Sequence, residues 1–449
     1  MNTMISKTIT MGLLTASLFV GSFQPSVAQE LAPMPPTQPM ASPSMPEMPA
    51  LPPMPPTHFR KEISINKSEK VFKDLKSKEV SVEVNAGRSG DIYIDNTSRA
   101  IEIKAWNEPK VKVVTTIYYD GDASKLSDGE WFEKLNINVK TLGSSVRIKS
   151  GTVSSGGSYE VMGNTFNWSS GPASGVAIFN GEGETIGTKK NITRLVTIYL
   201  PKDNKVVVES KYADVTISDN LNKLTVDLTN GNLETQDINN FTLRSKYANV
   251  NTGNLQTAEV EFINGHFTTK EVDELDMDTK YSTVDIASAN KLHFVSTNDE
   301  YDIESAGSVR GQKNYGNLRI SKLLKSIEMD GTNADVKVRN IAPSVNVIQV
   351  YNKYADMRLP LRSLKSYAIN YSGPYSTVYG NFEKKPFKGK TIKNPSLDEA
   401  LEEKITKAIT QSLNGDETTT SEDKFSAAVG DGKGAQIDIR CQNCTVDFK

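Results

Sequence analysis

The sequence SKYADVTI, at residues 210–217, decides the fold because close variants of it return along the chain. SKYANVNT begins at Ser245, TKYSTVDI at Thr279 and NKYADMRL at Asn352. Aligned with their neighbours, these phrases define an apolar position that recurs every 15 to 21 residues, at Val215, Leu233, Val250, Phe267, Val284, Ile303, Leu318, Val336, Met357 and Val378. A period of about 18 residues with strand, corner and strand in each copy predicts an all-β chain, a β-solenoid of stacked coils.

Two further columns mark the corner of each copy. A small residue stands two places before the apolar position, and Tyr or Asn stands one place before the small residue. Asn230 followed by Gly231 is therefore the same corner as Tyr212 followed by Ala213. Gly and Asn tolerate the left-handed backbone that such a corner demands, which supports the alignment.

The corner column predicts a partial ladder of tyrosines up one edge, alternating with Asn over the first five copies. One copy is an exception, because Glu300 and Tyr301 fill its two corner positions in this alignment. The tyrosines of the ladder are candidate binding residues: Tyr212, Tyr247, Tyr281, Tyr315 and Tyr354.

An antiparallel meander is the alternative to the solenoid, because Asn-Gly between two strands is also a hairpin signal. The columns keep their register over ten copies, and Tyr and Asn replace one another freely in them. This favours coils stacked about 4.8 Å apart, whose inward apolar residues join into one continuous core.

The N-terminal residues predict export. Lys7, an apolar run at residues 11–20 and small residues ending at Ala28 are typical of a secretory signal peptide, at residues 1–28. Residues 29–58 hold eleven of the 20 prolines and predict an extended, disordered linker. No later stretch has the length and apolarity of a transmembrane helix.

Five methionines lie in this linker, at Met34, Met40, Met45, Met48 and Met54. Thioether sulfurs bind Cu(I), so a copper site is one interpretation. We favour a low-complexity tether instead, because no His or Cys accompanies the methionines beyond His58 at its end.

The repeat domain is expected at residues 59–384, interrupted by an irregular Gly- and Ser-rich excursion at 120–192. Residues 135–140 and 145–150 of the excursion alternate like strands. Three aromatic residues gather there, and their faces suit contact with a sugar or a peptide. These candidates are Tyr159, Phe166 and Trp168, for which local packing is the simpler interpretation.

Residues 385–449 are expected to hold an α-helix, a closing Gly-rich strand and a last coil. Ser396 and Glu399 form a capping box, and Gly415 follows the helical pattern. The helix is expected to cover part of the solenoid, and a partner-binding role is the alternative.

Two stretches carry a resemblance to a known family. VVVESKYADVTI and QKNYGNLRI match a pattern of alternating apolar residues, Ser, Tyr-Gly-Asp and a final apolar pair. Residues 203–380, and more loosely the run from Val80, resemble the bacterial β-strand-repeat family labelled "putative adhesin" or domain of unknown function. FSAAVGDGKGAQIDIRCQNCTVDFK resembles the closing strand and last coil of that family. The resemblance implies a β-solenoid at the surface or in the periplasm of a bacterium, with no assigned activity.

Enzymatic motifs are scarce. No His, Cys and carboxylate cluster has metal-ligand spacing, and no nucleophile elbow or phosphate loop occurs, so we expect no enzyme, cofactor or metal. Lys and Arg total 52 against 54 for Asp and Glu, which does not suit a nucleic-acid partner. Four carboxylates crowd one corner and could form a calcium site or a catalytic pair, although charged residues at a corner more often face water. They are Asp299, Glu300, Asp302 and Glu304.

Cys441 and Cys444 are the only cysteines. Four residues around a turn bring their Cα atoms within about 7 Å, so we expect a structural disulfide in an exported protein. A redox pair is the alternative, but it needs a helix N-terminus to stabilise the thiolate, and none is expected here.

The sequence therefore predicts an exported, non-enzymatic β-solenoid that acts as an adhesin-like binding module of the cell envelope, with a polysaccharide or protein ligand. A carbohydrate-active enzyme on the same scaffold and a purely structural envelope protein are the alternatives.

Overall fold

The computed structural model describes residues 75–119, 126–151, 155–161, 164–170, 176–180, 185–189, 195–387 and 424–449. The expected signal peptide, the linker with its five methionines and the helix expected after Ser396 lie outside the described residues. The described chain is mostly β, as predicted, with one 22-stranded mixed sheet and a separate two-stranded sheet.

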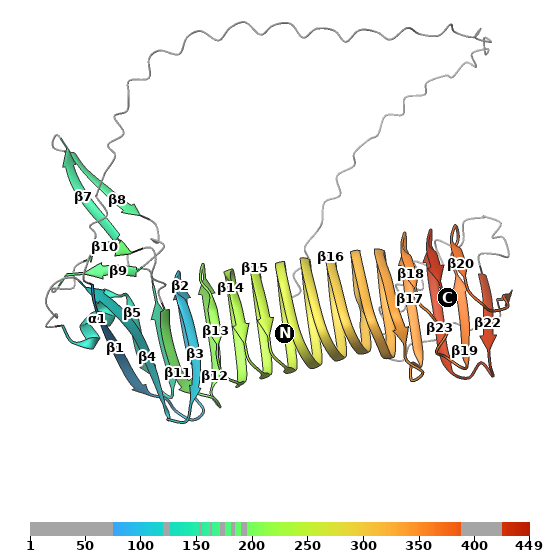
Figure 1. Ribbon diagram of the computed structural model, residues 1–449, viewed down its shortest axis with the longest axis horizontal. Coiled ribbons are helices and arrows are strands. Elements are labelled where there is room, and N and C mark those ends of the chain that lie inside the picture. The colour runs from blue at the N-terminus through green and yellow to red at the C-terminus, as the bar shows by residue number, and fades with distance from the viewer. Residues whose placement is uncertain are drawn as a thin grey trace, which may run out of the picture. The chain divides into compact units, whose positions relative to one another are not determined.

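The centre of the large sheet consists of strands that pair in parallel with the next segment of the chain (Figure 1). These strands are β12 (Lys205–Lys211), β13 (Val215–Ile217), β14 (Leu221–Thr235), β15 (Ile238–Thr252) and β16 (Leu255–Ile341). Leu228 of β14 lies opposite Ser245 of β15, and Leu233 lies opposite Val250. Because this register is parallel, the meander alternative is wrong for this part of the chain.

The period-2 pattern explains why these segments form strands. Leu224, Val226 and Leu228 point inward and are buried, whereas Asp227 between them is exposed. Residues one segment further on repeat the arrangement, as Phe241 and Leu243 do. Each paired segment therefore extends one common core, and burying each large apolar side chain contributes roughly 1.5 to 3 kcal/mol.

The segments turn at residues with left-handed backbone. Eleven such residues form the corners of the coils from Tyr212 onward, with φ between 53° and 64°. They are Tyr212, Asn230, Tyr247, Asn264, Tyr281, Asn298, Tyr315, Asn333, Tyr354, Tyr375 and Asn443.

One corner corrects the sequence alignment. Asn298, with φ of 58°, is the left-handed residue of the copy that the alignment had centred on Glu300. The small-residue column is then filled by Asp299, and Tyr301 takes the buried apolar column in place of Ile303. The shift restores an even spacing of 17 residues from Tyr281 to Asn298, the same as from Asn298 to Tyr315.

At the N-terminal side of the large sheet, parallel and antiparallel pairings mix. Its elements are β1 (Lys76–Asn85), β2 (Ile92–Thr97), β3 (Ala100–Trp106), β4 (Lys110–Tyr119), α1 (Asp128–Lys134), β5 (Ile137–Leu142), β6 (Ser145–Ser150), β9 (Val176–Phe179), β10 (Thr185–Lys189) and β11 (Leu195–Pro201). β2 pairs in parallel with both β12 and β6, while β1 pairs antiparallel with β4.

The expected excursion at 120–192 is more regular than its composition predicts. Strands β5 and β6 match the two strand-like stretches and join the large sheet through β2. The helix α1 was not predicted, although Ser127 and Glu130 form a capping box at its start. Its Trp131 is buried edge-on against Phe179 of β9, with 5.2 Å between ring centroids. Both residues belong to the same hydrophobic core as the buried residues of the coils.

At the C-terminal side, the last coil is inserted out of sequence order. The strands here are β17 (Val347–Lys353), β18 (Asp356–Arg358), β19 (Tyr367–Ser372), β20 (Thr377–Tyr379), β21 (Lys385–Pro386), β22 (Lys424–Val429), β23 (Ala435–Gln442) and β24 (Thr445–Asp447). β23 pairs in parallel with β17 on one side and with β19 on the other. β24 likewise lies between β18 and β20.

The last coil was expected to close the stack, but in the structure it lies between two coils that precede it in the sequence. The fit is close, because a Cβ atom at Gly373 would meet the Cys441 carbonyl oxygen at 1.7 Å. β22 pairs antiparallel with β19 and with β21, so the parallel pairing ends at these strands. Phe425 of β22 stacks on Tyr371, with ring centroids 5.1 Å apart.

Candidate functional site

The inserted coil completes a strict alternation along one edge. In sheet order, the corner of the inserted coil, Asn443, lies between those of Tyr354 and Tyr375. The corners then read Tyr212, Asn230, Tyr247, Asn264, Tyr281, Asn298, Tyr315, Asn333, Tyr354, Asn443 and Tyr375. We call this row the Tyr–Asn edge, in which six tyrosines and five asparagines alternate without a break.

The six tyrosines of the edge project into solvent. Their exposed fractions lie between 50% at Tyr315 and 70% at Tyr375. Parallel strands lie about 4.8 Å apart, so successive tyrosines are about 9.6 Å apart along the edge. The five candidate tyrosines thus lie in one row, together with Tyr375, which stands in the same column of the sequence alignment.

The left-handed conformation is unfavourable for tyrosine. A bulky residue with positive φ is an outlier, and left-handed backbone costs roughly 1 to 2 kcal/mol for residues other than Gly and, to a lesser degree, Asn and Asp. Asn fills the same corner at five positions, so the fold itself does not require Tyr. Strain that packing does not explain points to a functional surface.

The asparagines of the edge have unused hydrogen-bonding groups. Among the described residues, none of the five has a side-chain hydrogen bond to the protein. Asparagines elsewhere behave differently: the side chains of Asn232 and Asn249 bond to each other at 3.0 Å, and Asn232 also bonds to Asp214. The amides of the edge are therefore available to a ligand.

A buried polar cluster lies directly behind the edge at Asn298. The Asp299 carboxylate is fully buried and accepts four hydrogen bonds. The donors are the backbone N–H groups of Ser282 (2.6 Å) and Thr297 (2.9 Å) and the hydroxyls of Thr279 (2.7 Å) and Ser296 (2.7 Å). Donors on the same coil and on the preceding one thereby satisfy a carboxylate that would otherwise be costly to bury.

Lys313 and Tyr301 complete this cluster. The Lys313 ammonium donates to the Asp299 carbonyl oxygen at 2.7 Å and to the Ser296 hydroxyl at 3.0 Å. It also lies 5.0 Å from the centre of the Tyr301 ring. Burial lowers the pKa of the Lys313 ammonium to about 8, against the opposing effect of Asp299. Burial also raises the pKa of the Tyr301 hydroxyl well above its ordinary range.

The four carboxylates that crowd this corner in the sequence are not brought together. Asp299 is enclosed, whereas Glu300 is exposed and pairs with Arg319 at 3.3 Å. Asp302 and Glu304 are also exposed, on either side of the buried Ile303. In the part of the chain that the structure describes, no group of three or more His, Cys, Asp or Glu residues could hold a metal ion.

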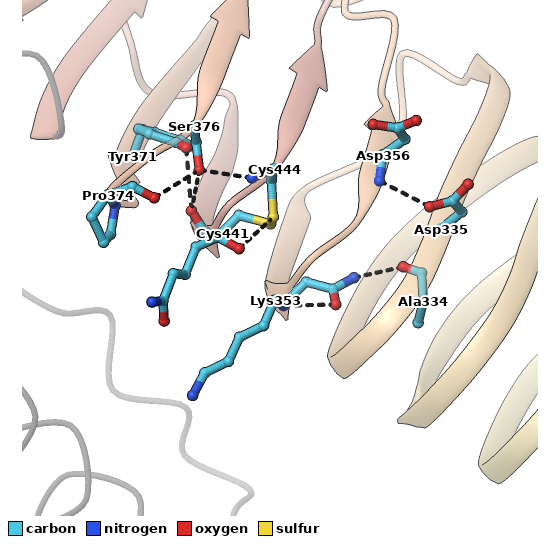
Figure 2. The surroundings of a disulfide bond; sticks show 11 residues. Ala334, Asp335, Lys353, Asp356, Tyr371, Pro374, Ser376, Cys441 and Cys444 are labelled. Carbon is cyan, nitrogen blue, oxygen red and sulfur yellow. Dashed lines mark hydrogen bonds between the residues drawn. A yellow bond between two sulfur atoms is a disulfide. The ribbon is translucent and has the colours of Figure 1, made fainter. Parts of the chain in front are cut away.

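Cys441 and Cys444 form a disulfide across the corner of the inserted coil, with 5.8 Å between their Cα atoms. Figure 2 shows the hydroxyl of Ser376, from the next coil, held between them. It accepts from the Cys444 N–H at 3.0 Å and donates to the Cys441 carbonyl oxygen at 2.8 Å. Both cysteines are buried, so the disulfide supports a local turn inside the sheet.

The aromatic candidates of the excursion lie on a different sheet from the Tyr–Asn edge. β7 (Ser155–Val161) and β8 (Asn164–Ser170) form a hairpin. Its register places Tyr159 opposite Phe166 and Trp168 opposite Gly157. Whether these residues bind a ligand stays a prediction.

Sequence reasoning missed the buried cluster and the full length of the edge. Asp299 stands in a column that holds small residues elsewhere, and Lys313 stands in a column of mixed character that includes Leu228 and Phe262. Nothing in the local pattern distinguishes these two residues from solvated charges. The alignment places Asn443 in the corner column, but its position between Tyr354 and Tyr375 could not be predicted because its coil follows Tyr375 in the chain. One sequence signal could have indicated the missing corner. Tyr354 and Tyr375 are consecutive corners in the chain, whereas the alternation elsewhere places an Asn corner between two Tyr corners.

No protein-family model matches the sequence, and no curated protein matches it. Among solved structures, a "putative adhesin" from Parabacteroides distasonis is 14% identical, with a TM-score of 0.32, and the match covers 62% of this chain and 97% of that one. A "putative adhesin" from Parabacteroides merdae is 11% identical, with a TM-score of 0.31, covering 62% and 96%.

A third solved structure carries a different name. It is a "putative lipid binding protein" from Parabacteroides distasonis, 12% identical with a TM-score of 0.27, and the match covers 61% of this chain and 94% of that one. At these identities and TM-scores, the likeness assigns neither a ligand nor an activity to this chain. In the described ranges, no helix is long and apolar enough to cross a membrane.

Proposed function

We propose that this protein is an exported β-solenoid that binds an extended polymer along its Tyr–Asn edge without catalysing a reaction. The observation that carries this proposal is the unbroken alternation of six exposed, left-handed tyrosines with five asparagines. Nothing in the packing of the coils demands that alternation.

The solenoid interpretation rests on the parallel register between successive segments and on the even spacing of their corners. Each segment exposes apolar residues unless a neighbour covers them, which is the property of a repeat that is stable only in a stack. Export rests on residues 1–28, which have the composition of a signal peptide, and on the disulfide.

The carboxylates near Asn298 are already engaged in contacts within the protein, which favours binding over catalysis. The buried carboxylate of Asp299 already accepts four hydrogen bonds and so has no free position for a substrate proton. Glu300 pairs with Arg319, and the remaining carboxylates of this corner alternate with buried residues along a strand.

The test compares the mature protein with a variant that carries Tyr247→Asn, Tyr281→Asn and Tyr315→Asn. Each change keeps a residue that adopts the left-handed corner but removes a ring. Co-sedimentation with insoluble bacterial cell envelopes measures binding, and a reducing-end assay on a panel of polysaccharides measures cleavage. We expect the variant to lose most of the binding and both proteins to release no sugar.

Tyr379→Asn is the matched control, because Tyr379 is an exposed tyrosine that lies on β20 outside the corner column. It should bind like the unchanged protein. Equal binding by the triple variant would refute the edge as the binding surface and favour a purely structural protein. Release of reducing ends would favour the enzyme alternative.

A further inference from the structure

The Tyr–Asn edge repeats every two coils in charge as well as in shape. Lys directly precedes the corner at four of the six tyrosines and at none of the five asparagines. These lysines are Lys211, Lys246, Lys280 and Lys353. A ligand matched to the edge should therefore present one equivalent unit per two coils, or about every 9.6 Å.

A polyproline II helix has this repeat. It advances about 3.1 Å per residue with three residues per turn, so one turn covers about 9.3 Å. An extended β-strand advances about 6.6 Å per two-residue repeat and would fall out of step with the tyrosines after one pair. The tyrosine spacing therefore selects the polyproline II conformation among regular peptide conformations.

The chemistry of the edge also suits such a ligand. A polyproline II backbone makes no internal hydrogen bonds, and proline has no N–H, so its carbonyl oxygens need donors from outside. The amides of the edge asparagines have no protein partner within the described residues, and they lie midway between successive tyrosines. Exposed aromatic rings in turn provide flat faces against which proline rings pack, as in other proline-rich recognition sites.

The geometry points to a proline-rich polypeptide in the polyproline II conformation as the ligand of the Tyr–Asn edge, with three residues per two coils. Prolines at every third position pack against the tyrosines, and the asparagine amides donate to the carbonyl oxygens between them. From Tyr212 to Tyr375 the edge spans ten coil spacings, which accommodates about 15 such residues. This inference rests on the proposed function, because it names the polymer that the edge binds.

The test uses synthetic peptides and the mature protein, with binding measured by fluorescence anisotropy. The matched peptides are (Pro-Pro-Gln)3 and (Pro-Pro-Gln)5. The control peptides are (Pro-Pro-Gln-Gln)4, whose proline repeat has the wrong length, and (Gly-Gly-Gln)5, which lacks the preformed conformation. A β-1,4-linked chitin hexasaccharide tests a glycan in place of a peptide.

The protein variant for this test exchanges two neighbouring corners, Tyr247→Asn with Asn264→Tyr. It keeps the composition of the edge but breaks the two-coil repeat, and both corners still hold residues that the fold accepts in this conformation. Should the exchange fail to fold, as judged by circular dichroism, Tyr281→Asn alone interrupts the row in the same way.

We expect (Pro-Pro-Gln)5 to bind at least about tenfold more tightly than either control peptide and than (Pro-Pro-Gln)3, since it spans more tyrosines. The corner exchange should weaken its binding by about tenfold. Binding of (Pro-Pro-Gln)5 no stronger than that of the controls, an exchange without effect, or a preference for the glycan would each overturn the inference. The triple Tyr→Asn variant then tells the two proposals apart, because loss of envelope binding in that variant leaves the proposed function standing.

Discussion

Tyrosine at the corner of every second coil lowers the stability of the fold, because its backbone is left-handed there. Asn occupies the intervening corners with the same backbone dihedrals, and its short polar side chain suits the left-handed region better. The tyrosines therefore trade stability for an exposed row of rings, as strained residues at functional sites commonly do.

We predict that Tyr281→Asn stabilises the protein or leaves its stability unchanged. Tyr281 is 62% exposed, so little packing is lost, while the relief of left-handed strain contributes up to about 1 kcal/mol. Urea unfolding gives the free energy directly. A loss of more than about 1 kcal/mol would mean that the ring supports the fold. Tyr301→Asn, at a buried position in the apolar column, is the contrasting variant and should cost several kcal/mol.

Because the pKa of Lys313 is lowered in the folded protein, we predict that stability rises with pH in the alkaline range. Its pKa is about 8 in the folded protein and near 10.5 when unfolded, so between pH 8 and pH 10 the unfolded chain holds more protons. The free energy of unfolding should therefore rise with pH across that window, by roughly 2 kcal/mol. Above pH 10 the trend reverses, because Tyr301 keeps its proton in the folded chain and loses it in the unfolded chain.

Lys313→Met should flatten the rise between pH 8 and pH 10, since it removes the titrating group but keeps an apolar stem beside the Tyr301 ring. Chemical unfolding at three pH values measures the slope for both proteins. An unchanged slope in the variant would assign the pH dependence to another group.

The corner residues illustrate what could be predicted at this scale. The Asn-Gly corners could be predicted from the sequence, because Asn tolerates left-handed backbone and Gly permits close approach. The Tyr-Ala pairs were recognised as corners only through their alignment with the Asn-Gly corners. The burial of Asp299 could not be predicted from the sequence. Its carboxylate is satisfied by donors from Thr279, Ser282 and Ser296, which belong to the same coil or the preceding one. A buried charge of this kind becomes visible only when the coils are stacked.

At the scale of elements, the inserted coil β23–β24 is the main departure from expectation. The sequence predicts that a coil forms near Cys441 but assigns it to the end of the stack. Its actual place follows from both of its edges, because β17 and β19 each pair with β23 over its length. The local sequence pattern predicts that a segment forms a strand, but it does not predict with which other strands that segment pairs.

The disulfide should stabilise this coil. Reduction, or the double change Cys441→Ser and Cys444→Ser, is expected to lower the free energy of unfolding by about 2 kcal/mol, near the low end for disulfides because the closed loop is short. Thermal unfolding with and without dithiothreitol measures the effect. The double variant should not respond to the reductant, and a response there would trace the effect to something other than this bond.

At the scale of the whole described sheet, deletions can change the number of coils with or without changing the alternation of Tyr and Asn along the edge. Removing residues 238–254 deletes one coil and joins Asp237 to Leu255, which keeps the apolar columns in register but places Asn230 beside Asn264. Removing residues 238–271 deletes two coils and preserves the alternation of Tyr and Asn.

We predict that both deletions fold cooperatively, because each coil contacts only its neighbours. Only the two-coil deletion should retain envelope binding close to that of the unchanged protein. Circular dichroism and co-sedimentation test the two halves of this prediction. Equal binding by both variants would show that the edge does not act as a periodic row.

The coil that lies between β17 and β19 follows both of these strands in the sequence, so it leaves the ribosome after them. Until residues 435–447 arrive, the strands that will flank them have unpaired N–H and C=O groups and uncovered apolar side chains, which are the features that aggregation and proteolysis exploit. A chain that stopped before residue 435 would leave that gap open. The sheet therefore depends on residues 435–447, which are translated after the strands that they join.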